Sequence, residues 1–432
     1  MDKTMRIPMM GSELTLPERQ WEKLRAVLRR IDSMEASFYA SRLRNAGVVP
    51  AGINGIEDFL RRVPFTRKDD LLADRLAHPP FGTNFTEPLH RYTRFCQTTG
   101  TVSGQPMAVL DTPDSWEAML NCWRQVYRAA GLKAGKDRIF FAFGFGPFLG
   151  FWTAFEAAST DYLVLPGGGL SSQARLEMMK RYHATVLCCT PTYALRLGEN
   201  IGVASDVRLD ELSVEKIIVA GEPGGSMPTT RERLRALWGN VQIFDHHGMS
   251  EVGPVSYEDP EHEGSLCIME DAYIAEVLDA EGHEVPDGSE GELVLTTLTR
   301  TASPLLRYRT GDWVSKQRID GKPYLDGGIL ARTDDMAVIR GVNIYPSAVE
   351  NIICRYPEVT EFMIEQKRVD NMEEIEVLVE LGIGRDQTEV ADVLRRLEDR
   401  LRDTFCLRIP VRVVGDGTLP RFEFKARRWR KV

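Results

Sequence analysis

The stretch Val-Gln-Ile-Phe-Asp-His-His-Gly-Met-Ser-Glu, residues 241–251, joins a short apolar run to a polar, glycine-containing turn. Its first five residues have the length and apolar content of a buried β-strand, and the turn residues end that strand. Similar apolar runs alternate with helical patterns at residues 139–145, 162–166, 185–190 and 216–220. Strands that alternate with helices in this way predict a doubly wound, mostly parallel α/β sheet.

Polar and glycine-containing segments follow two of these strands. Gly221-Glu222-Pro223 comes directly after residues 216–220, and residues 247–251 come directly after residues 241–245. Ligands of parallel α/β sheets bind beyond the carboxyl ends of the strands. We therefore expect the two segments to line one ligand site.

The flanking regions have different patterns. Residues 18–31 carry apolar residues at helical spacing, and the runs after residue 271 are β-rich with glycine-containing turns, which predicts a β subdomain. Residues 336–432 mix helical and strand patterns in a compact α+β arrangement. These changes predict a large N-terminal domain, residues 1–332, and a small α+β C-terminal domain, residues 333–432.

The overall composition excludes some classes of partner. The chain has 432 residues and a formal net charge of -9, so a nucleic acid or an anionic membrane is not expected as its main partner. No apolar run approaches the roughly 20 residues that span a bilayer. The first residues lack the apolar core of a signal peptide. Seven scattered cysteines do not form a disulfide pattern, so we expect a cytoplasmic protein.

Four blocks in order carry a family resemblance. They are DHHGMSE at 245–251, LRYRTGD at 306–312, ARTDDMAVIRGVNIYP at 331–346 and LPRFEFKAR at 419–427. Together they resemble the acyl-adenylate-forming, AMP-binding enzyme superfamily, and within it the phenylacetate-CoA ligase type. The resemblance implies an ATP-dependent acid-CoA ligase that adenylates an aryl or arylacetic carboxylate, releases pyrophosphate and transfers the acyl group to CoA. It also implies Mg²⁺ and a mobile C-terminal domain.

The resemblance further implies a nucleotide site. It would be formed by Thr98, Thr99, Gly100, Thr101, Ser103, Gly104, Gly221, Glu222, Pro223, Asp245, His247, Gly248, Met249, Ser250, Asp312 and Gly341. Residues 98–106 are rich in hydroxyls and glycine, and the amides of such a loop can cradle phosphates. An ordinary polar turn is the alternative. The family loop is typically one residue shorter and has lysine where Gln105 stands.

The block around residue 247 is assigned to the base and the metal. By resemblance, His247 takes the place of a tyrosine that stacks on adenine, and Ser250 and Glu251 match a metal pair. Glu251 would bind Mg²⁺, a hard cation that prefers carboxylate and phosphate oxygens. The alternatives are a structural histidine and an acidic residue that caps a helix.

The later blocks supply the remaining implied roles. Asp312 would accept both ribose hydroxyls, Arg332 would reach the same nucleotide, and Asp334 would be the hinge about which the C-terminal domain swings. Gly341 would border the pantetheine of CoA. Lys425 would contact the carboxylate and the α-phosphate, and with Glu251 and Arg332 it completes the implied catalytic set. Phe424 replaces the usual glycine, and the alternative is that Lys425 is one of several tail cations.

The acid pocket is predicted from an aromatic, glycine-rich segment. Phe143, Gly144, Phe145, Gly146 and Phe148 would form apolar walls that suit a flat aryl or arylacetic acid. The alternative is that these aromatic side chains pack the core between the sheet and a helix.

His262 and Cys267 lie five residues apart in a segment whose counterpart in some relatives is rich in cysteine and histidine. They suggest a structural Zn²⁺ site, with Glu258 or His246 as further ligands. Without a CxxC pair, a metal-free acidic loop is the favoured interpretation.

Two alternatives to an acid-CoA ligase stay open. The acyl group could pass to a carrier-protein thiol or an amine, or AMP could pass to a phenolic cofactor. A nucleotide-binding protein without catalysis is the second alternative, because Gln105, His247 and Phe424 depart from the family motifs. The sequence leaves a homodimer and the identity of the acid open.

Overall fold

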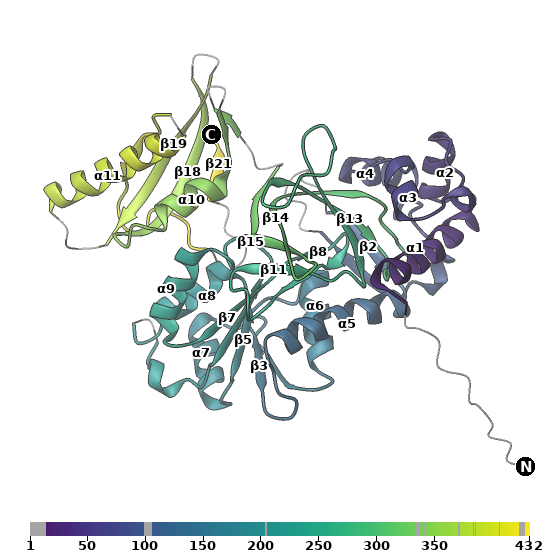
Figure 1. Cartoon of the computed structure of the whole chain (residues 1–432). Helices are drawn as coiled ribbons and strands as arrows, with labels where there is room; N and C mark the ends of the chain where they lie inside the picture. Colours follow the sequence, from purple (N-terminus) through teal and green to yellow (C-terminus); the bar gives the residue numbers. More distant parts are fainter. Residues whose placement is uncertain are drawn as a thin grey trace, which may run out of the picture.

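The structure is a computed structural model. It describes residues 14–98, 106–203, 205–333, 337–339, 342–369, 372–382, 384, 386–405, 407–422 and 428–432. The chain forms a large N-terminal part, drawn from purple to green in Figure 1, and a smaller C-terminal part drawn in light green and yellow. Short 3-10 helices lie at Pro50–Gly52, Leu89–Arg91 and Leu209–Glu211.

The N-terminal region is helical, as predicted. Its helices are α1 (Leu16–Asp32), α2 (Phe38–Asn45), α3 (Ile56–Arg62) and α4 (Lys68–Ala77). At the start of helix α1, Glu18 Oε2 accepts a hydrogen bond of 2.7 Å from Thr15 N, which satisfies one backbone donor of the first turn. Its apolar face buries Leu24 and Ile31 against α2, α3 and residues of the β subdomain. This packing attaches the helical region to the rest of the chain.

The predicted parallel sheet is confirmed. Its strands run in the order β4-β3-β5-β6-β7, and all neighbours are parallel. Their bounds are β3 (Arg138–Phe141), β4 (Leu163–Pro166), β5 (Val186–Cys189), β6 (Lys216–Ala220) and β7 (Gln242–His246). The helices of this region are α5 (Pro113–Ala129), α6 (Leu149–Ala158), α7 (Ser172–Arg181), α8 (Pro191–Glu199) and α9 (Pro228–Trp238). They cover the sheet so that each face has its own apolar core.

One predicted strand is too long. The expected run 139–145 ends at Phe141, because the chain then turns through two glycines instead of continuing along the sheet. Gly146 N donates to Gly144 O at 2.9 Å, and Phe148 N donates to Gly146 O at 2.7 Å. A Cβ at Gly146 would lie 2.7 Å from the Phe148 ring, so this turn requires glycine.

The β subdomain is also confirmed. An antiparallel sheet has the order β10-β11-β15-β14-β13-β12. Its strands are β10 (Ser256–Glu258), β11 (Ser265–Ile268), β12 (Tyr273–Leu278), β13 (Glu290–Thr297), β14 (Tyr308–Ile319) and β15 (Lys322–Arg332). Irregular pairing between β13 and β14 and between β14 and β15 changes the register along the long strands.

The C-terminal part has the predicted α+β pattern with two additions. It contains α10 (Pro346–Ile353), β18 (Val359–Val369), β19 (Met372–Leu381), α11 (Gln387–Phe405) and β20 (Val411–Val413). The additions are the hairpin β16 (Ala337–Ile339) with β17 (Val342–Ile344), and β21 (Trp429–Lys431), which pairs in parallel with β18. Ser347 Oγ at the start of α10 donates to Leu330 O of β15 at 2.5 Å, so this part contacts the β subdomain.

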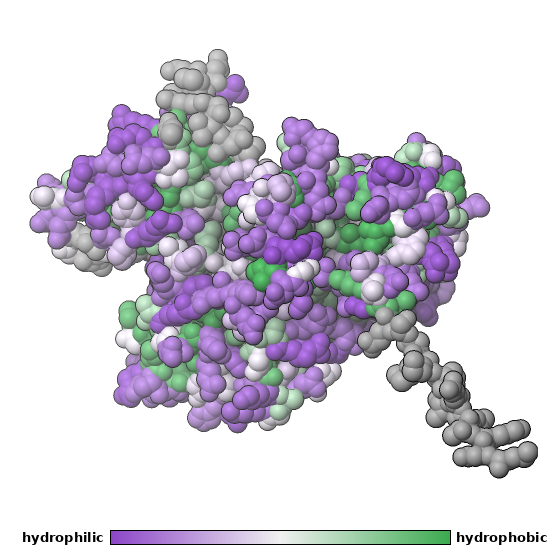
Figure 2. Space-filling model, in the orientation of Figure 1, coloured by the Kyte–Doolittle hydropathy of each residue, from purple (hydrophilic) through white to green (hydrophobic). Residues whose placement is uncertain are grey.

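The surface face drawn in Figure 2 is mostly hydrophilic, and its hydrophobic residues form separate small patches. Within the part of the chain that the structure describes, no helix is long and apolar enough to cross a membrane.

Candidate active site

The two predicted turn segments meet at the carboxyl edge of the parallel sheet. Ala220, the last residue of β6, pairs with His246, the last residue of β7, so the residues that follow them lie side by side. Gly221 has a φ of 95°, which lets the chain turn sharply away from the strand. Glu222 Oε1 accepts a hydrogen bond of 2.8 Å from Thr192 N at the start of α8. One role of Glu222 is therefore to anchor this turn to a helix.

One cluster contains Asp312, His247 and Arg332. Residues that bind one nucleotide together, as predicted for these three, must lie close to one another. His247 Nε2 lies 3.0 Å from Asp312 Oδ2, and Arg332 NH1 donates to Asp312 Oδ1 at 2.8 Å. Asp312 and Arg332 are cross-strand partners on β14 and β15, so the sheet register holds them together. Asp312 is buried, and a guanidinium and an imidazole already contact its two oxygens. The ribose role stays a prediction.

His247 has one hydrogen-bonding atom that the protein does not satisfy. The imidazole is buried, and its Nδ1 has no partner among the residues that the structure describes. An unpaired buried polar atom costs free energy. A ligand beside His247 would supply the missing hydrogen bond, so the cluster fits a bound nucleotide.

Asp245 belongs to a buried network beneath this edge. Its Oδ2 accepts a hydrogen bond of 2.7 Å from Ser226 Oγ, and Oδ1 accepts one of 2.9 Å from His246 N. A Cβ at Gly225 would lie 2.3 Å from the same carboxylate, so the loop after β6 touches it closely. Burial raises the pKa of Asp245. These contacts give Asp245 a structural role, and direct contact with a nucleotide stays a prediction.

A buried ion pair supports the same strand. Arg231 NH1 lies 2.9 Å from Glu258 Oε2, and its NH2 donates to Ile243 O at 2.6 Å. Glu258 Oε2 also accepts from Asp245 N at 2.7 Å. Burial raises the pKa of Glu258, although Arg231 opposes this. The pair fixes the end of β7, where His247 begins the turn.

His246 gives a prediction about pH. The centroids of the His246 and Trp123 rings lie 4.2 Å apart, and His246 Nδ1 lies 2.6 Å from Ser256 O. Burial lowers the pKa of His246 to about 3. The unfolded chain binds a proton near pH 6.5, so the stability from neutral His246 is present above that pH and is lost as the pH falls toward 3. Between pH 7.5 and 5.5 the wild type should lose about 1.4 kcal/mol more stability than His246→Gln. Thermal unfolding of both proteins at the two pH values measures this difference, and an equal loss would contradict it.

Glu251 has a cationic partner that the sequence does not single out. Its Oε1 lies 3.0 Å from Lys68 Nζ, the first residue of α4, and the Glu251 side chain is 9% exposed. The two residues are far apart in the sequence. The sequence around Lys68 indicates only the start of a helix and gives no sign of a contact with Glu251. A carboxylate that can hold a cation and an adjacent ammonium suit the phosphates of a nucleotide.

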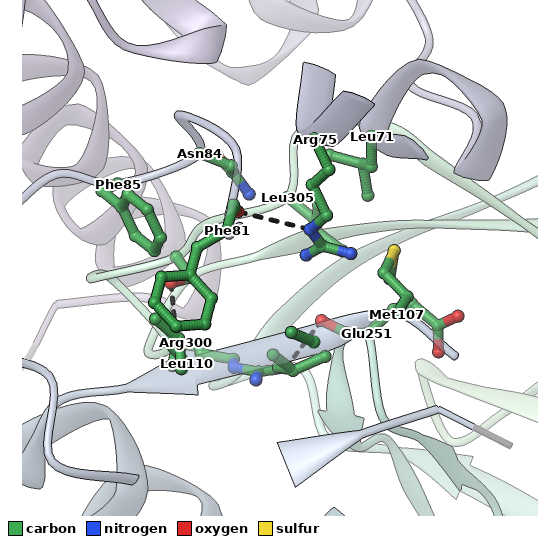
Figure 3. A pocket seen from close by; sticks show the side chains of 13 residues that line it. Leu71, Arg75, Phe81, Asn84, Phe85, Met107, Leu110, Glu251, Arg300 and Leu305 are labelled. Atoms are coloured by element: carbon green, nitrogen blue, oxygen red, sulfur yellow. Dashed lines mark hydrogen bonds between the residues drawn. The ribbon is translucent and has the colours of Figure 1, made fainter. Parts of the chain in front are cut away.

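A small cavity adjoins Glu251. It has a volume of about 30 Å³, which is room for roughly one water molecule. Figure 3 shows Arg75 extending from α4 toward the side on which Glu251, Met107 and Arg300 lie. Arg75 Nε donates to Phe81 O at 3.3 Å, NH1 has no partner among the described residues, and burial lowers the Arg75 pKa to about 10.

The predicted phosphate loop is only partly described. Thr98 is buried, and its Oγ1 accepts a hydrogen bond of 2.9 Å from Met107 N. Thr98 continues β1 (Arg94–Gln97), which pairs with β2 (Ala108–Asp111). The following predicted site residues lie outside the described residues: Thr99, Gly100, Thr101, Ser103, Gly104, Asp334, Gly341 and Lys425.

Gly248 and Met249 form β8 (Gly248–Met249), which pairs with β9 (Gly253–Pro254), and Ser250 follows directly.

The aromatic segment forms a continuous cluster. Phe143 is buried and stacks on Phe151 of α6, with ring centroids 4.1 Å apart. Phe145 and Phe148 are only half-buried, and they contact Trp152 and Phe151 of α6 respectively. Phe143 therefore belongs to the core, as the alternative interpretation holds, whereas Phe145 and Phe148 remain available to a ligand. Gly144 and Gly146 form the turn between them.

The residues proposed for zinc do not form a metal site in the described part of the chain. There, no group of three histidine, cysteine, aspartate or glutamate side chains is placed to hold an ion. Glu258 pairs with Arg231, and His246 Nδ1 contacts a backbone carbonyl. His262 packs edge-on against Tyr324, and Cys267 Sγ lies 3.8 Å from Ile268 O. The geometry thus gives the zinc hypothesis no support.

Comparisons with known proteins extend this picture. A family model described as AMP-binding enzyme matches residues 98–299, and one described as AMP-binding enzyme C-terminal domain matches residues 341–430. The phenylacetate-coenzyme A ligase of Thermus thermophilus is 34% identical over 442 residues, with 95% of this chain and 96% of that ligase covered. The Escherichia coli phenylacetate-coenzyme A ligase is 30% identical, with 90% and 89% covered.

A solved structure shares the whole fold. The structure of 2-hydroxyisobutyryl-CoA ligase in the postadenylation state with 2-HIB-AMP has a TM-score of 0.86 at 25% identity, covering 98% of this chain and 94% of that one. The same ligase in the thioesterification state, with 2-HIB-AMP and CoA, has a TM-score of 0.68. The arrangement of this chain is therefore more similar to the postadenylation state.

The fold and the site define a nucleotide-binding enzyme with a large α/β N-terminal domain, a β subdomain and a C-terminal domain. The chain belongs to the AMP-binding enzyme family. Within that family it is an AMP-forming acid-thiol ligase of the phenylacetate-CoA ligase type.

Proposed function

We propose that the chain activates an aryl or arylacetic acid with ATP and passes the acyl group to CoA. The observation that carries this proposal is the cluster of His247, Asp312 and Arg332 at the carboxyl edge of the sheet, with an unsatisfied buried Nδ1 on His247. The likeness to phenylacetate-coenzyme A ligases over nearly the full chain supports both the reaction and the acid class.

In this proposal the nucleotide is held from two sides. Residues 221–223 and His247 contact the base, and Asp312 accepts the ribose hydroxyls while Arg332 fixes its carboxylate. Holding ATP and the acid together replaces an unfavourable encounter between two anions with an attack inside one complex. The carboxylate oxygen attacks the α-phosphate, and pyrophosphate leaves.

The phosphates lie toward Glu251 and Lys68. Glu251 has a carboxylate of the kind that Mg²⁺ prefers, and a nucleotide would supply further oxygens. When bound, Mg²⁺ neutralises negative charge on the phosphates. Glu251 would hold it, and Lys68 adds a positive charge at the same place.

The acid would lie against the exposed edges of Phe145 and Phe148. Their rings, with Trp152, give an apolar surface, and Gly146 packs closely against the Phe148 ring. Flat apolar walls favour a planar ring over a branched or polar chain. Lys425 would neutralise the carboxylate and α-phosphate during adenylation, and Asp334 would act as the hinge before the acyl transfer.

The test of the proposed function is product analysis with purified protein, ATP, Mg²⁺, CoA and phenylacetate, benzoate or octanoate. We expect AMP, pyrophosphate and a CoA thioester in equal amounts with an aryl or arylacetic acid. Formation of AMP and pyrophosphate without a thioester would favour a carrier-protein or amine acceptor. No AMP with any acid would contradict the proposal.

The same proposal places the enzyme in the cytoplasm. The described cysteines are thiols, and burial raises the pKa of Cys122 and Cys188 to about 12, which keeps them protonated and unreactive. A reducing compartment suits such thiols. A homodimer stays a prediction from the sequence.

Lys68→Ala tests the role of the helix α4 cation. Removing the ammonium 3.0 Å from Glu251 should slow pyrophosphate exchange roughly tenfold, equivalent to about 1.4 kcal/mol, because the phosphates lose a positive partner. Thioester formation from a supplied acyl-adenylate should keep its rate. Lys316→Ala, which removes a lysine 2.8 Å from Glu284 in the β subdomain, is the matched control. Equal exchange rates in the two variants would exclude Lys68 from adenylation.

A further inference from the structure

Arg300 is among the largest fully buried side chains of the protein, and it makes a two-pronged ion pair. Its Nε donates to Asp111 Oδ1 at 2.7 Å, and its NH2 donates to Asp111 Oδ2 at 2.6 Å. Burial alone would lower the pKa of Arg300, but the charge and hydrogen bonds of Asp111 outweigh it and raise the pKa. Two parallel bonds fix the plane of the guanidinium, which a single bond would not do.

The remaining prong of Arg300 reaches the segment that carries Glu251. NH1 donates to Ser250 O at 2.9 Å and to Glu251 O at 2.6 Å. Figure 3 shows Arg300 and this hydrogen bond to Glu251 along one wall of the cavity. Both carbonyls are thus fixed by one nitrogen, whose direction Asp111 sets. This contact therefore holds the backbone that carries Glu251.

Asp111 connects Arg300, and through it the backbone of residues 250–251, to the β1–β2 hairpin. It is the last residue of β2 and pairs with Arg94 of β1, at the opposite end of the hairpin from Thr98. Two further bonds join this strand and the following helix to the segment after Arg300. Ser303 Oγ donates to Leu110 O at 2.9 Å, and Ala302 N donates to Ser115 Oγ at 3.2 Å. These bonds therefore join the hairpin and the Glu251 segment to residues 300–303.

We propose that Arg300 and Asp111 are positioning residues that hold Glu251 at the metal-nucleotide site. This inference rests on the proposed function, in which Glu251 binds Mg²⁺. Neither residue is expected to touch the nucleotide, because within the described part of the chain the hydrogen bonds of Arg300 go to Asp111 and to the two carbonyls. They act by fixing the backbone from which the Glu251 carboxylate extends. Residues behind a metal ligand set its orientation and so its affinity.

The alternative is that this ion pair only stabilises the fold. The chain contains a matched pair that separates the two interpretations. Arg307 is buried, its Nε and NH2 lie 3.0 Å and 2.6 Å from Glu276, and its NH1 donates to the backbone carbonyl of Val63 at 3.0 Å. It has the same fork and the same kind of backbone contact, but none of these bonds goes to the Glu251 segment.

The experiment compares Arg300→Lys with Arg307→Lys. Lysine keeps the positive charge but cannot make the two parallel hydrogen bonds of the guanidinium to its carboxylate. Both variants should therefore lose a similar amount of fold stability. The measurement is the affinity for Mn²⁺ in the presence of ATP, followed by the electron paramagnetic resonance signal of free Mn²⁺. The affinity should fall ten- to a hundredfold in Arg300→Lys, which is typical of losing a group behind a metal ligand. It should fall by less than twofold in Arg307→Lys. Thioester formation from a supplied acyl-adenylate should be equal in the two variants.

Asp111→Asn provides a second variant if Arg300→Lys does not fold, because it keeps the shape and loses the charge that directs the guanidinium. It should also weaken Mn²⁺ binding. Equal Mn²⁺ affinities in the Arg300 and Arg307 variants, while Glu251→Gln weakens binding, would overturn this inference alone. Unchanged Mn²⁺ binding in Glu251→Gln would overturn both this inference and the metal role of Glu251 in the proposed function.

Discussion

Replacing Lys425 by alanine should abolish acid-dependent exchange of pyrophosphate into ATP while leaving the transfer of a supplied acyl-adenylate to CoA intact. Two unit charges about 4 Å apart interact by about 4 kcal/mol at a near-surface effective dielectric. Loss of that energy in the transition state corresponds to a rate reduction of roughly a thousandfold. The measurement is the exchange rate at saturating acid and ATP.

Lys431→Ala is the matched control for this variant. Lys431 lies in the same basic tail, on β21, and its side chain is exposed. It should retain wild-type exchange, because it pairs with β18 through its backbone and is not expected to reach the nucleotide. If Lys425→Ala and Lys431→Ala exchange pyrophosphate equally well, Lys425 has no part in adenylation.

Glu251→Gln should reduce pyrophosphate exchange by about a hundredfold or more, because it removes the charged ligand proposed for Mg²⁺. The loss should shrink as the Mg²⁺ concentration rises, since the amide keeps an oxygen that binds the ion weakly. The rate as a function of Mg²⁺ concentration measures both effects. Thioester formation from a supplied acyl-adenylate should change little, because pyrophosphate has already left.

Glu284→Gln is the control for Glu251→Gln. Glu284 also pairs with a lysine, at 2.8 Å, but in the β subdomain, so its loss tests the general effect of neutralising such a pair. An unchanged Mg²⁺ dependence in Glu251→Gln would mean that the ion binds elsewhere.

The local sequence predicts most of the fold, and its failures have physical causes. The strands of the parallel sheet are short apolar runs between helices, so their positions follow from burial alone. β21 is different, because Trp429, Arg430 and Lys431 have the composition of a charged tail. Charged residues suit the edge of a sheet, and only the pairing with β18 makes this segment a strand. Similarly, β3 ends early because glycines turn the chain after Phe141.

The candidate site is predictable where it follows from sheet topology. Residues after β6 and β7 must meet because parallel neighbouring strands end at the same edge, and the residues after Ala220 and His246 do so. Lys68, Arg300 and Asp111 are not predictable in this way. Each belongs to a segment far from Glu251 in the sequence, and its contact depends on how the helical region, the β1–β2 hairpin and the β subdomain pack.

The central claim is that this chain forms an acyl-adenylate from an aryl or arylacetic acid. The most direct measurement is acid-dependent exchange of labelled pyrophosphate into ATP with Mg²⁺ present and CoA absent, across aryl, arylacetic and fatty acids. We expect exchange that requires the acid and is fastest with an aryl or arylacetic acid. Exchange with fatty acids alone would contradict the assigned acid class, and the absence of exchange with every acid, in protein that binds ATP, would contradict adenylation itself.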